Sequence, residues 1–236
     1  MSTILTARGI SVHFGGVVAL DRVDLDIERG AIHGLIGPNG AGKTTLINIL
    51  SGLIPPTSGS LSVDGVSGGP WSVARTVENG LVRTFQQTRA FLGLTVAENF
   101  RIAAVSSGSA IDMEIIEAFD LHPLMKETAG DLSYAFLRRL GIALALSLHP
   151  KVLLLDEPAV GLTSHDLDRM ASIIRARNAR GVTILLVEHN MKFLMSLATR
   201  VTVLAQGRVL FEGSPEKCQS NPLVIETYLG TEAEHA

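Results

Sequence analysis

Residues 37–45 combine glycines, one lysine and two threonines at a spacing suited to phosphate chemistry. The stretch fits the pattern G-x-x-x-x-G-K-[ST], which predicts a phosphate-binding loop between a strand and a helix. Glycines allow a tight turn whose N–H groups point at an anion, and the following helix adds the positive end of its dipole. A glycine-rich turn with an exposed lysine is the alternative, but the apolar segment before the loop and the helical pattern after it favour phosphate binding. The predicted nucleotide-binding residues are Gly37, Pro38, Asn39, Gly40, Ala41, Gly42, Lys43, Thr44 and Thr45.

Four side chains, two within this pattern and two much further along the sequence, have individual chemistry. We expect Lys43 to reach the β- and γ-phosphates of a nucleoside triphosphate such as ATP, and the Thr44 hydroxyl to ligate Mg²⁺. Asp156 and Glu157 follow a fully apolar segment, and ligands of α/β sheets bind at the carboxyl ends of strands. Asp156 is therefore expected to hold Mg²⁺, directly or through water, and Glu157 to polarise the attacking water. A solvated turn is the alternative for this pair alone; the phosphate loop favours the catalytic interpretation.

The elements that must position these residues alternate between strand and helix patterns. Apolar and β-branched stretches predict strands at 4–12, 23–27, 31–36, 60–64, 81–85, 152–155, 183–187, 201–205 and 209–211. Capping residues and apolar spacing predict helices at 42–51, from Thr95, at 111–121, at 133–148, from Ser164 and from Ser214. Such alternation predicts an α/β core with a largely parallel sheet. We expect a single domain over 1–236, with its core at about 1–85 and 150–213, a helical insertion at about 86–149 and a helical tail at about 214–236.

The composition limits the possible classes of protein. The chain has 236 residues, 46% of them hydrophobic, which is enough for a substantial core. A net charge of −3 disfavours nucleic acid as the main partner, and the single cysteine, Cys218, fits a reducing compartment. The most apolar region, 140–155, is divided at 149–151 into pieces too short to span a bilayer, and no secretory signal is predicted. We therefore expect a soluble protein.

Several motifs occur in one order along nearly the whole chain. They are Gly37–Thr45, Gln86, Leu132-Ser133, Leu153–Pro158 and Glu188-His189. Together they resemble the ATP-binding cassette (ABC) ATPases. The resemblance implies a P-loop NTPase core with a mostly parallel sheet, an antiparallel β part near the N-terminus and a helical subdomain.

The resemblance also implies roles for individual residues. Phe14 resembles the aromatic residue that stacks on adenine, although an ordinary core phenylalanine is the alternative. Gln86 resembles the glutamine that senses Mg²⁺ and the γ-phosphate and links to the membrane partner, and His189 the histidine that orders water and γ-phosphate. The implied catalytic residues are Glu157, His189, Gln86 and Lys43, and the implied metal ligands are Thr44, Gln86 and Asp156.

One motif departs from the family pattern. The signature Leu-Ser-Gly-Gly-Gln reads here from Leu132 to Phe136, so that Ser133 is kept while Ala135 and Phe136 replace the second glycine and the glutamine. Thr163 also stands where the family often has aspartate. In the family Ser133 would face the γ-phosphate of the opposite subunit. We hypothesise a heterodimer of two ABC ATPases with one weakened site; the alternative is that Ala135 is tolerated and a homodimer is active.

The chain most resembles the LivG-type ATPases of branched-chain amino acid importers. The resemblance lies in the stretches 13–16, 83–86, 187–192 and 221–230, while the helical region is shorter than usual for that group. It implies ATP hydrolysis with Mg²⁺, coupled to uptake through two integral membrane permease subunits and, indirectly, an extracytoplasmic solute-binding protein. The chain would lie peripherally on the cytoplasmic face of the membrane, with residues 90–94 as a candidate docking surface or as local core. Alternatives are a lipopolysaccharide-export-like ATPase, a soluble non-transport ABC ATPase and a regulatory module without turnover.

Overall fold

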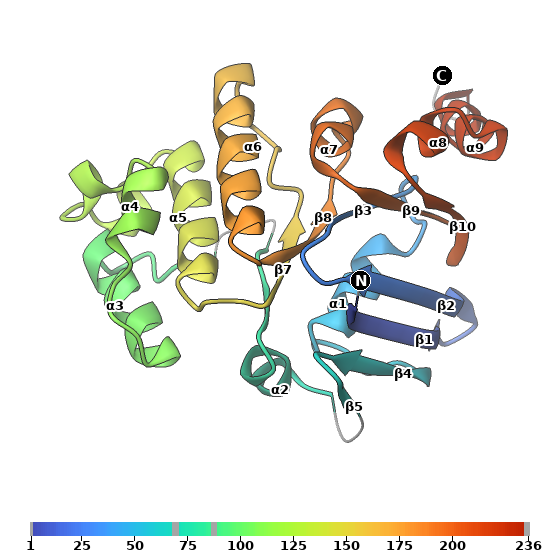
Figure 1. The fold of residues 1–236 in the computed structure, drawn as a ribbon, viewed down its shortest axis with the longest axis horizontal. Coiled ribbons are helices and arrows are strands. Elements are labelled where there is room, and N and C mark those ends of the chain that lie inside the picture. The colour runs from blue at the N-terminus through green and yellow to red at the C-terminus, as the bar shows by residue number, and fades with distance from the viewer. Residues whose placement is uncertain (1, 68–70, 86–88, 234–236) are drawn as a thin grey trace.

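A computed structural model describes residues 2–67, 71–85 and 89–233, with two sheets flanked by helices (Figure 1). The larger sheet has the strand order β10-β9-β3-β8-β7-β6, parallel from β9 to β6, with β10 antiparallel at one edge. Its strands are β3 (Ile32–Ile36), β6 (Leu81–Arg83), β7 (Val152–Asp156), β8 (Thr183–Val187), β9 (Arg200–Ala205) and β10 (Arg208–Gly213). Every residue of β3, β7 and β8 is buried, as expected for parallel strands that are covered on both faces.

The smaller sheet is antiparallel and lies toward the N-terminus. Its order is β2-β1-β4-β5, from β1 (Thr3–Phe14), β2 (Val17–Glu28), β4 (Ser58–Val63) and β5 (Val66–Ser67). The α/β class, the mostly parallel sheet and the antiparallel part that we expected are therefore confirmed. The strand predicted at 23–27 is the second half of a longer strand, because β2 pairs with β1 from the hairpin tip onward.

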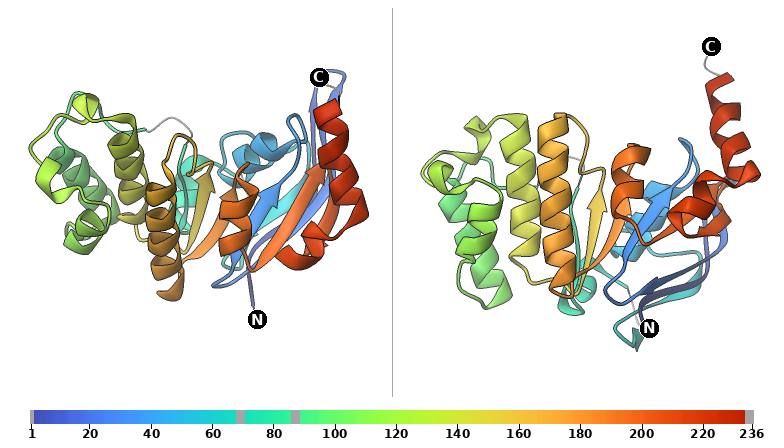
Figure 2. Two further views of the ribbon diagram at one scale, coloured as in Figure 1. Left: turned by 90° about the horizontal axis from the view of Figure 1, so that it is seen from above. Right: turned by 45° about the horizontal axis from the view of Figure 1, so that its top comes forward.

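Helices cover both faces of the larger sheet. They are α1 (Lys43–Leu50), α2 (Val73–Glu78), α3 (Val96–Ser107), α4 (Met113–Ala118), α5 (Tyr134–Leu146), α6 (Ser164–Ala179), α7 (Met191–Leu197), α8 (Pro215–Gln219) and α9 (Pro222–Ala233), with 3-10 turns at His122–Leu124 and Ala129–Asp131. Helices α3, α4 and α5 gather on one side of the molecule, and α8 and α9 lie at the opposite end (Figures 1 and 2).

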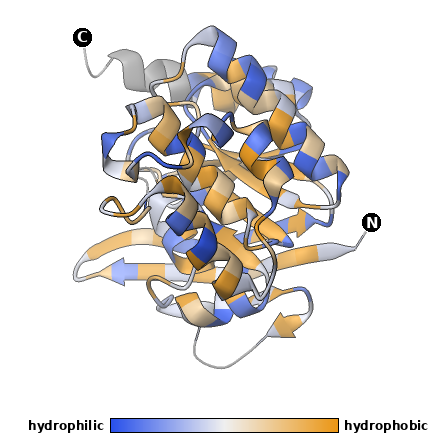
Figure 3. Cartoon of the chain, turned by 90° about the vertical axis from the view of Figure 1, so that its left-hand side faces the viewer, coloured by the Kyte–Doolittle hydropathy of each residue, from blue (hydrophilic) through white to orange (hydrophobic). Residues whose placement is uncertain are grey.

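Alternate side chains of the central strands enter two different cores. Val152 and Leu154 of β7 pack with α1 and the antiparallel sheet, whereas Leu153 and Leu155 pack with the helices α3–α7. Apolar residues accordingly dominate the inner strands, while the helices alternate apolar and polar residues (Figure 3). This arrangement fixes β3 and β7 side by side with β8, so that their carboxyl ends open on one edge of the sheet.

Several predicted elements differ from the observed ones. The helix predicted at 111–121 is wrong in length, because α4 ends at Ala118 and Phe119 is its C-cap. Helices α2 and α7 were not predicted; both are short and begin at polar N-caps, Ser72 and Asn190. Among the helices of the described residues, none is long and apolar enough to cross a membrane.

Candidate nucleotide-binding site

The predicted phosphate loop joins the end of β3 to the start of α1. Gly37, Gly40 and Gly42 all have positive φ angles, 155°, 78° and 101°. A Cβ at Gly37 would lie 2.2 Å from the backbone oxygen of Leu204, so the close approach of β9 requires glycine there. The Gly207 N–H donates to the Ala41 carbonyl, which fixes the loop against the β9–β10 turn. The backbone thus forms a glycine cradle at the N-terminus of a helix, which suits an anion.

Lys43 is the first residue of α1 and is buried. Its ammonium donates to the carbonyl oxygens of Gly37 and Pro38, at 2.6 and 3.0 Å, and is thereby held over the loop. Burial lowers the pKa of Lys43, while the carboxylates of Glu157 and Asp156 oppose that effect. The lysine at the start of α1 and the two carboxylates at the end of β7 thus act on one another electrostatically.

The remaining loop residues provide backbone and hydroxyl groups. Thr44 is exposed and Thr45 is partly exposed, next to Lys43 at the helix start. Asn39 and Gly40 are exposed at the loop tip, and Pro38 is half-buried. The Thr44 hydroxyl is therefore available to a ligand above the loop.

Asp156 and Glu157 lie at the end of β7. The Asp156 side chain is 5% exposed and accepts a 2.9 Å hydrogen bond from Arg83 on its Oδ2 atom. Glu157 has a φ of 50°, a left-handed conformation that is uncommon for a residue with a side chain. Its N–H donates to the Val187 carbonyl at 2.8 Å, which holds this conformation against the neighbouring strand β8.

The left-handed backbone directs Glu157 toward His189, in the loop after β8. The His189 Nε2 atom lies 3.0 Å from Glu157 Oε1. The structure therefore brings together two predicted catalytic residues that are far apart in the sequence. A third carboxylate, on Glu188, is 2% exposed and accepts from the N–H groups of Ala159, His189 and Asn190.

Burial is the largest influence on Glu188 and raises the pKa of its carboxyl. Its three backbone hydrogen bonds tie the loop after β7 to the loop after β8. Sequence reasoning placed Glu188 in a motif but missed this supporting role, because no local signal shows that a carboxylate will face backbone N–H groups of a distant loop.

Phe14 ends β1 beside the hairpin turn at Gly15 and is 54% exposed. An ordinary core phenylalanine is thereby excluded. Val17 and Val18 across the hairpin are also exposed, at 66% and 53%, so Phe14 belongs to an apolar surface at the hairpin tip.

Ser133 is the N-cap of α5, and its side chain accepts from the Phe136 N–H at 3.5 Å. Helix α5 lies on the opposite side of β7 from α1, so one chain does not bring Ser133 to its own phosphate loop (Figures 1 and 2). The Tyr134 ring instead packs against Gly161, where a Cβ would meet it at 2.9 Å. Gln86, the remaining predicted site residue, lies outside the described residues.

The donor set suits a magnesium nucleotide. Hydroxyl and carboxylate oxygens, here from Thr44 and Asp156, are the hard ligands that Mg²⁺ prefers. The glycine cradle and the lysine suit the polyphosphate. Among the described residues, no cluster of three or more His, Cys, Asp or Glu side chains that could hold a metal ion is found.

Comparisons with known proteins agree with this geometry. The chain is 37% identical to the high-affinity branched-chain amino acid transport ATP-binding protein BraF of Pseudomonas aeruginosa, over 96% of this chain and 98% of that protein. It is also 37% identical to the high-affinity branched-chain amino acid transport ATP-binding protein LivG of Escherichia coli, over 96% of this chain and 98% of that protein. A solved ATP-binding cassette of an ABC transporter in its ADP conformation superimposes with a TM-score of 0.87 at 28% identity, over 98% of this chain and 100% of that one.

A nucleotide-free cassette from an ABC transporter has a TM-score of 0.86, also at 28% identity, over 96% of this chain and 99% of that chain. The ABC transporter family model matches residues 20–160, more than half of the sequence. The chain therefore belongs to the ABC transporter family of ATP-binding cassette ATPases.

Proposed function

We propose that this chain is the ATP-hydrolysing subunit of an importer for small solutes. Branched-chain amino acids are the solutes that we propose to test first. The observation that carries the proposal is the full-length 37% identity to two branched-chain amino acid transport ATP-binding proteins, together with the phosphate loop and the Glu157–His189 pair. The core is assigned to about 1–85 and 150–213, the helical subdomain to about 86–149 and the tail to about 214–236.

In the proposed site, each residue has one task. The loop residues 37–45 bind the phosphates, with Lys43 on the β- and γ-phosphates, and Phe14 stacks on the adenine. Thr44, Asp156 and Gln86 would hold Mg²⁺, which supplies charge neutralisation on the phosphate oxygens when bound.

Hydrolysis rests on the carboxylate of Glu157. Its Oε1 atom accepts the proton of the attacking water, while His189, 3.0 Å away, orients that carboxylate and contacts the γ-phosphate. The left-handed backbone at Glu157 aims the carboxylate out of the strand direction of Asp156, so the two acids serve different functions.

The signature argues for an asymmetric pair of cassettes. Ser133 and the N-terminus of α5 face the nucleotide of a second ABC ATPase subunit, and Ala135 places a methyl group near that phosphate. We propose a heterodimer in which the site completed by this chain's signature is the weaker one.

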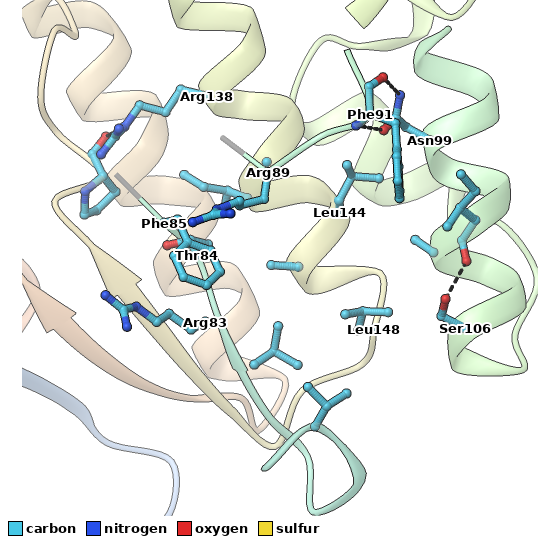
Figure 4. A pocket seen from close by; sticks show the side chains of 18 residues that line it. Arg83, Thr84, Phe85, Arg89, Phe91, Asn99, Ser106, Arg138, Leu144 and Leu148 are labelled. Atoms are coloured by element: carbon cyan, nitrogen blue, oxygen red, sulfur yellow. Dashed lines mark hydrogen bonds between the residues drawn. The ribbon is translucent and has the colours of Figure 1, made fainter. Parts of the chain in front are cut away.

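The permease contact is assigned to an apolar pocket of about 280 Å³ between the end of β6 and helices α3 and α5 (Figure 4). Its lining includes Phe91, 57% exposed, with Ile102, Leu144 and Leu148. Leu92 beside it is 50% exposed, so these side chains of the 90–94 stretch are surface rather than local core. An apolar cytoplasmic segment of a membrane permease fits this pocket, which would hold the chain at the membrane surface.

Nucleotide binding tests the core of the proposal. Lys43→Ala should lose ATP affinity in a fluorescent-ATP titration, whereas Lys151→Ala, which removes an exposed lysine paired with Asp64, should keep it. Equal affinity in both variants would contradict the assignment of the loop.

Partners are tested by co-purifying the tagged chain from gently solubilised native membranes. We expect two polytopic membrane proteins and a different ABC ATPase. Recovery of soluble partners only would contradict the importer proposal. Recovery of this chain as a homodimer alone would contradict the proposed heterodimer.

A further inference from the structure

Arg83, which sequence analysis assigned no role, occupies a buried position between the two elements that carry the proposed magnesium ligands. Its side chain is 6% exposed at the end of β6. One guanidinium nitrogen, Nη2, donates to Asp156 Oδ2 at 2.9 Å. The other, Nη1, donates to Asn48 Oδ1 at 2.6 Å and to Ser51 Oγ at 3.2 Å. Arg83 thus joins β7 to α1.

The partner on α1 is placed with respect to Thr44. Asn48 follows Thr44 by four residues, so both lie on one face of the helix, one turn apart. The hydrogen bond from Arg83 to Asn48 therefore also determines the position of Thr44. Asp156 is held at the same time, and Asp156 also donates its backbone N–H to Thr84 Oγ1 at 3.2 Å. The end of β6 thereby fixes both the backbone and the carboxylate of Asp156.

The hydrogen bond from Arg83 reaches one of the two oxygens of the Asp156 carboxylate. Among the described residues, the hydrogen bonds of the Asp156 carboxylate use Oδ2 only, which leaves Oδ1 for a magnesium-bound water. The rigid, planar guanidinium of Arg83 holds Asp156 Oδ2 and Asn48 Oδ1 at a fixed separation, which the single flexible ammonium of a lysine would not do.

Arg83 is itself held on its other side. The Phe85 ring lies between two guanidinium groups, with Arg83 and Arg89 each 4.9 Å from its centroid. Figure 4 shows Phe85 below Arg89 in the pocket, with the Arg83 side chain directed away from Leu144 and Leu148. The Arg83 guanidinium, which holds Asp156, is therefore packed against an aromatic ring. The Arg83 Nε atom has no hydrogen-bond partner among the described residues.

We propose that Arg83 is a positioning residue that sets the spacing between Thr44 and Asp156 and so determines the affinity of the ATP complex for Mg²⁺. A purely structural ion pair would neutralise Asp156 without depending on Asn48. The positioning role requires both hydrogen-bonded arms of the guanidinium. The inference rests on the proposed binding of magnesium ATP at this site.

The test measures Mg²⁺ affinity apart from turnover. The full chain, saturated with a fluorescent ATP analogue in EDTA, is titrated with Mg²⁺. Supporting residues around a metal ligand typically change metal affinity by 10–100-fold, so Arg83→Lys and Asn48→Ala should each raise the half-saturating Mg²⁺ concentration by about tenfold or more. Affinity for the analogue in EDTA should stay unchanged.

Asn48→Ala keeps the Arg83–Asp156 ion pair and guards against an Arg83 variant that fails to fold. Arg139→Lys is the matched control, because Arg139 is also a nearly buried arginine paired with two aspartates, Asp120 and Asp166, away from the loop. It should keep the wild-type Mg²⁺ titration.

Two results would overturn the inference. If Arg83→Lys and Asn48→Ala have the same half-saturating Mg²⁺ concentration as the wild type, the Arg83–Asp156 contact is only a structural ion pair. If the variants bind Mg²⁺ more tightly than the wild type, Arg83 competes with the cation. A wild-type chain that binds the analogue without any Mg²⁺ effect would instead contradict the proposed magnesium site itself, so the two failures are distinguishable.

Discussion

The Nε2 atom of His189 lies 3.0 Å from the Oε1 atom of Glu157, across the ends of two neighbouring parallel strands. The register that pairs Asp156 with Val187 places Glu157 beside Glu188, the residue before His189. Because Glu157 also donates its N–H to Val187, the sheet itself holds the contact. The carboxylate therefore has one partner that orients it and a backbone that cannot swing freely.

Replacing Glu157 by glutamine should preserve ATP binding and reduce hydrolysis. A general base contributes about 10²–10⁴-fold, so phosphate release from the assembled complex should fall by about a hundredfold or more. Glu117→Gln, an exposed acid on α4, is the control and should keep the wild-type rate. Unchanged turnover in Glu157→Gln would remove Glu157 from its proposed role.

His189→Ala should also slow phosphate release, and the double variant with Glu157→Gln should be little slower than the slower single variant. Residues that act as one unit lose their effects non-additively. The four rates form a double-mutant cycle. Additive losses would show that the two side chains act independently despite the hydrogen bond.

Restoring the second glycine of the signature should raise the activity of a dimer of this chain alone. Ala135→Gly removes the methyl group near the partner's phosphate, so that the backbone N–H groups can approach it more closely, and steady-state ATP hydrolysis should increase by at least about tenfold. Ala104→Gly on α3, also half-buried, controls for the loss of helix propensity. An unchanged rate in Ala135→Gly would show that the alanine is tolerated.

Two glycines of the phosphate loop should respond differently to alanine. At Gly37 a Cβ would lie 2.2 Å from the Leu204 oxygen, so Gly37→Ala should lower the free energy of unfolding by about 3 kcal/mol or more. At Gly40 a Cβ meets nothing within 4 Å, and only its positive φ is unfavourable, so Gly40→Ala should cost about 1 kcal/mol. Urea unfolding of both variants measures the difference; equal losses would contradict the assigned contact.

His33 should make the fold sensitive to acid. It is buried on β3, its Nε2 atom lies 2.8 Å from Thr202 Oγ1, and burial, with a smaller contribution from Arg200, lowers its pKa from 6.5 to about 4. The unfolded chain binds the proton more tightly, so this contribution to stability is present above pH 6.5 and is lost as the pH falls toward 4. Between pH 7 and pH 5 the loss should be about 2 kcal/mol.

Urea unfolding at several pH values tests the effect. The pH dependence should be shallower in His33→Gln than in the wild type, whatever its stability at pH 7. His122→Gln, which changes an exposed histidine, should keep the wild-type slope. A parallel slope in His33→Gln would place the acid sensitivity elsewhere.

The elements that sequence predicted well are those specified by neighbouring residues. Thr95 and Glu98 form the predicted capping box, and Ser133 and Ser214 cap their helices as expected. Each of these caps joins residues three positions apart, so it can be predicted from the local sequence. Helix α7 was missed because its seven residues directly follow the His189 motif and make a pattern too short to separate from a loop.

The sequence by itself determined the family motifs, the phosphate loop and the acidic pair at the end of β7, because their spacing is a property of contiguous residues. Only the tertiary structure decided which side chains meet. Glu157 and His189 are 32 residues apart and Arg83 and Asp156 are 73 apart, and each contact exists because parallel strands bring their carboxyl ends to one edge. The exposure of Phe14 likewise depends on where its hairpin ends relative to the core. Local pattern cannot show that, because burial is set by what packs from elsewhere in the chain.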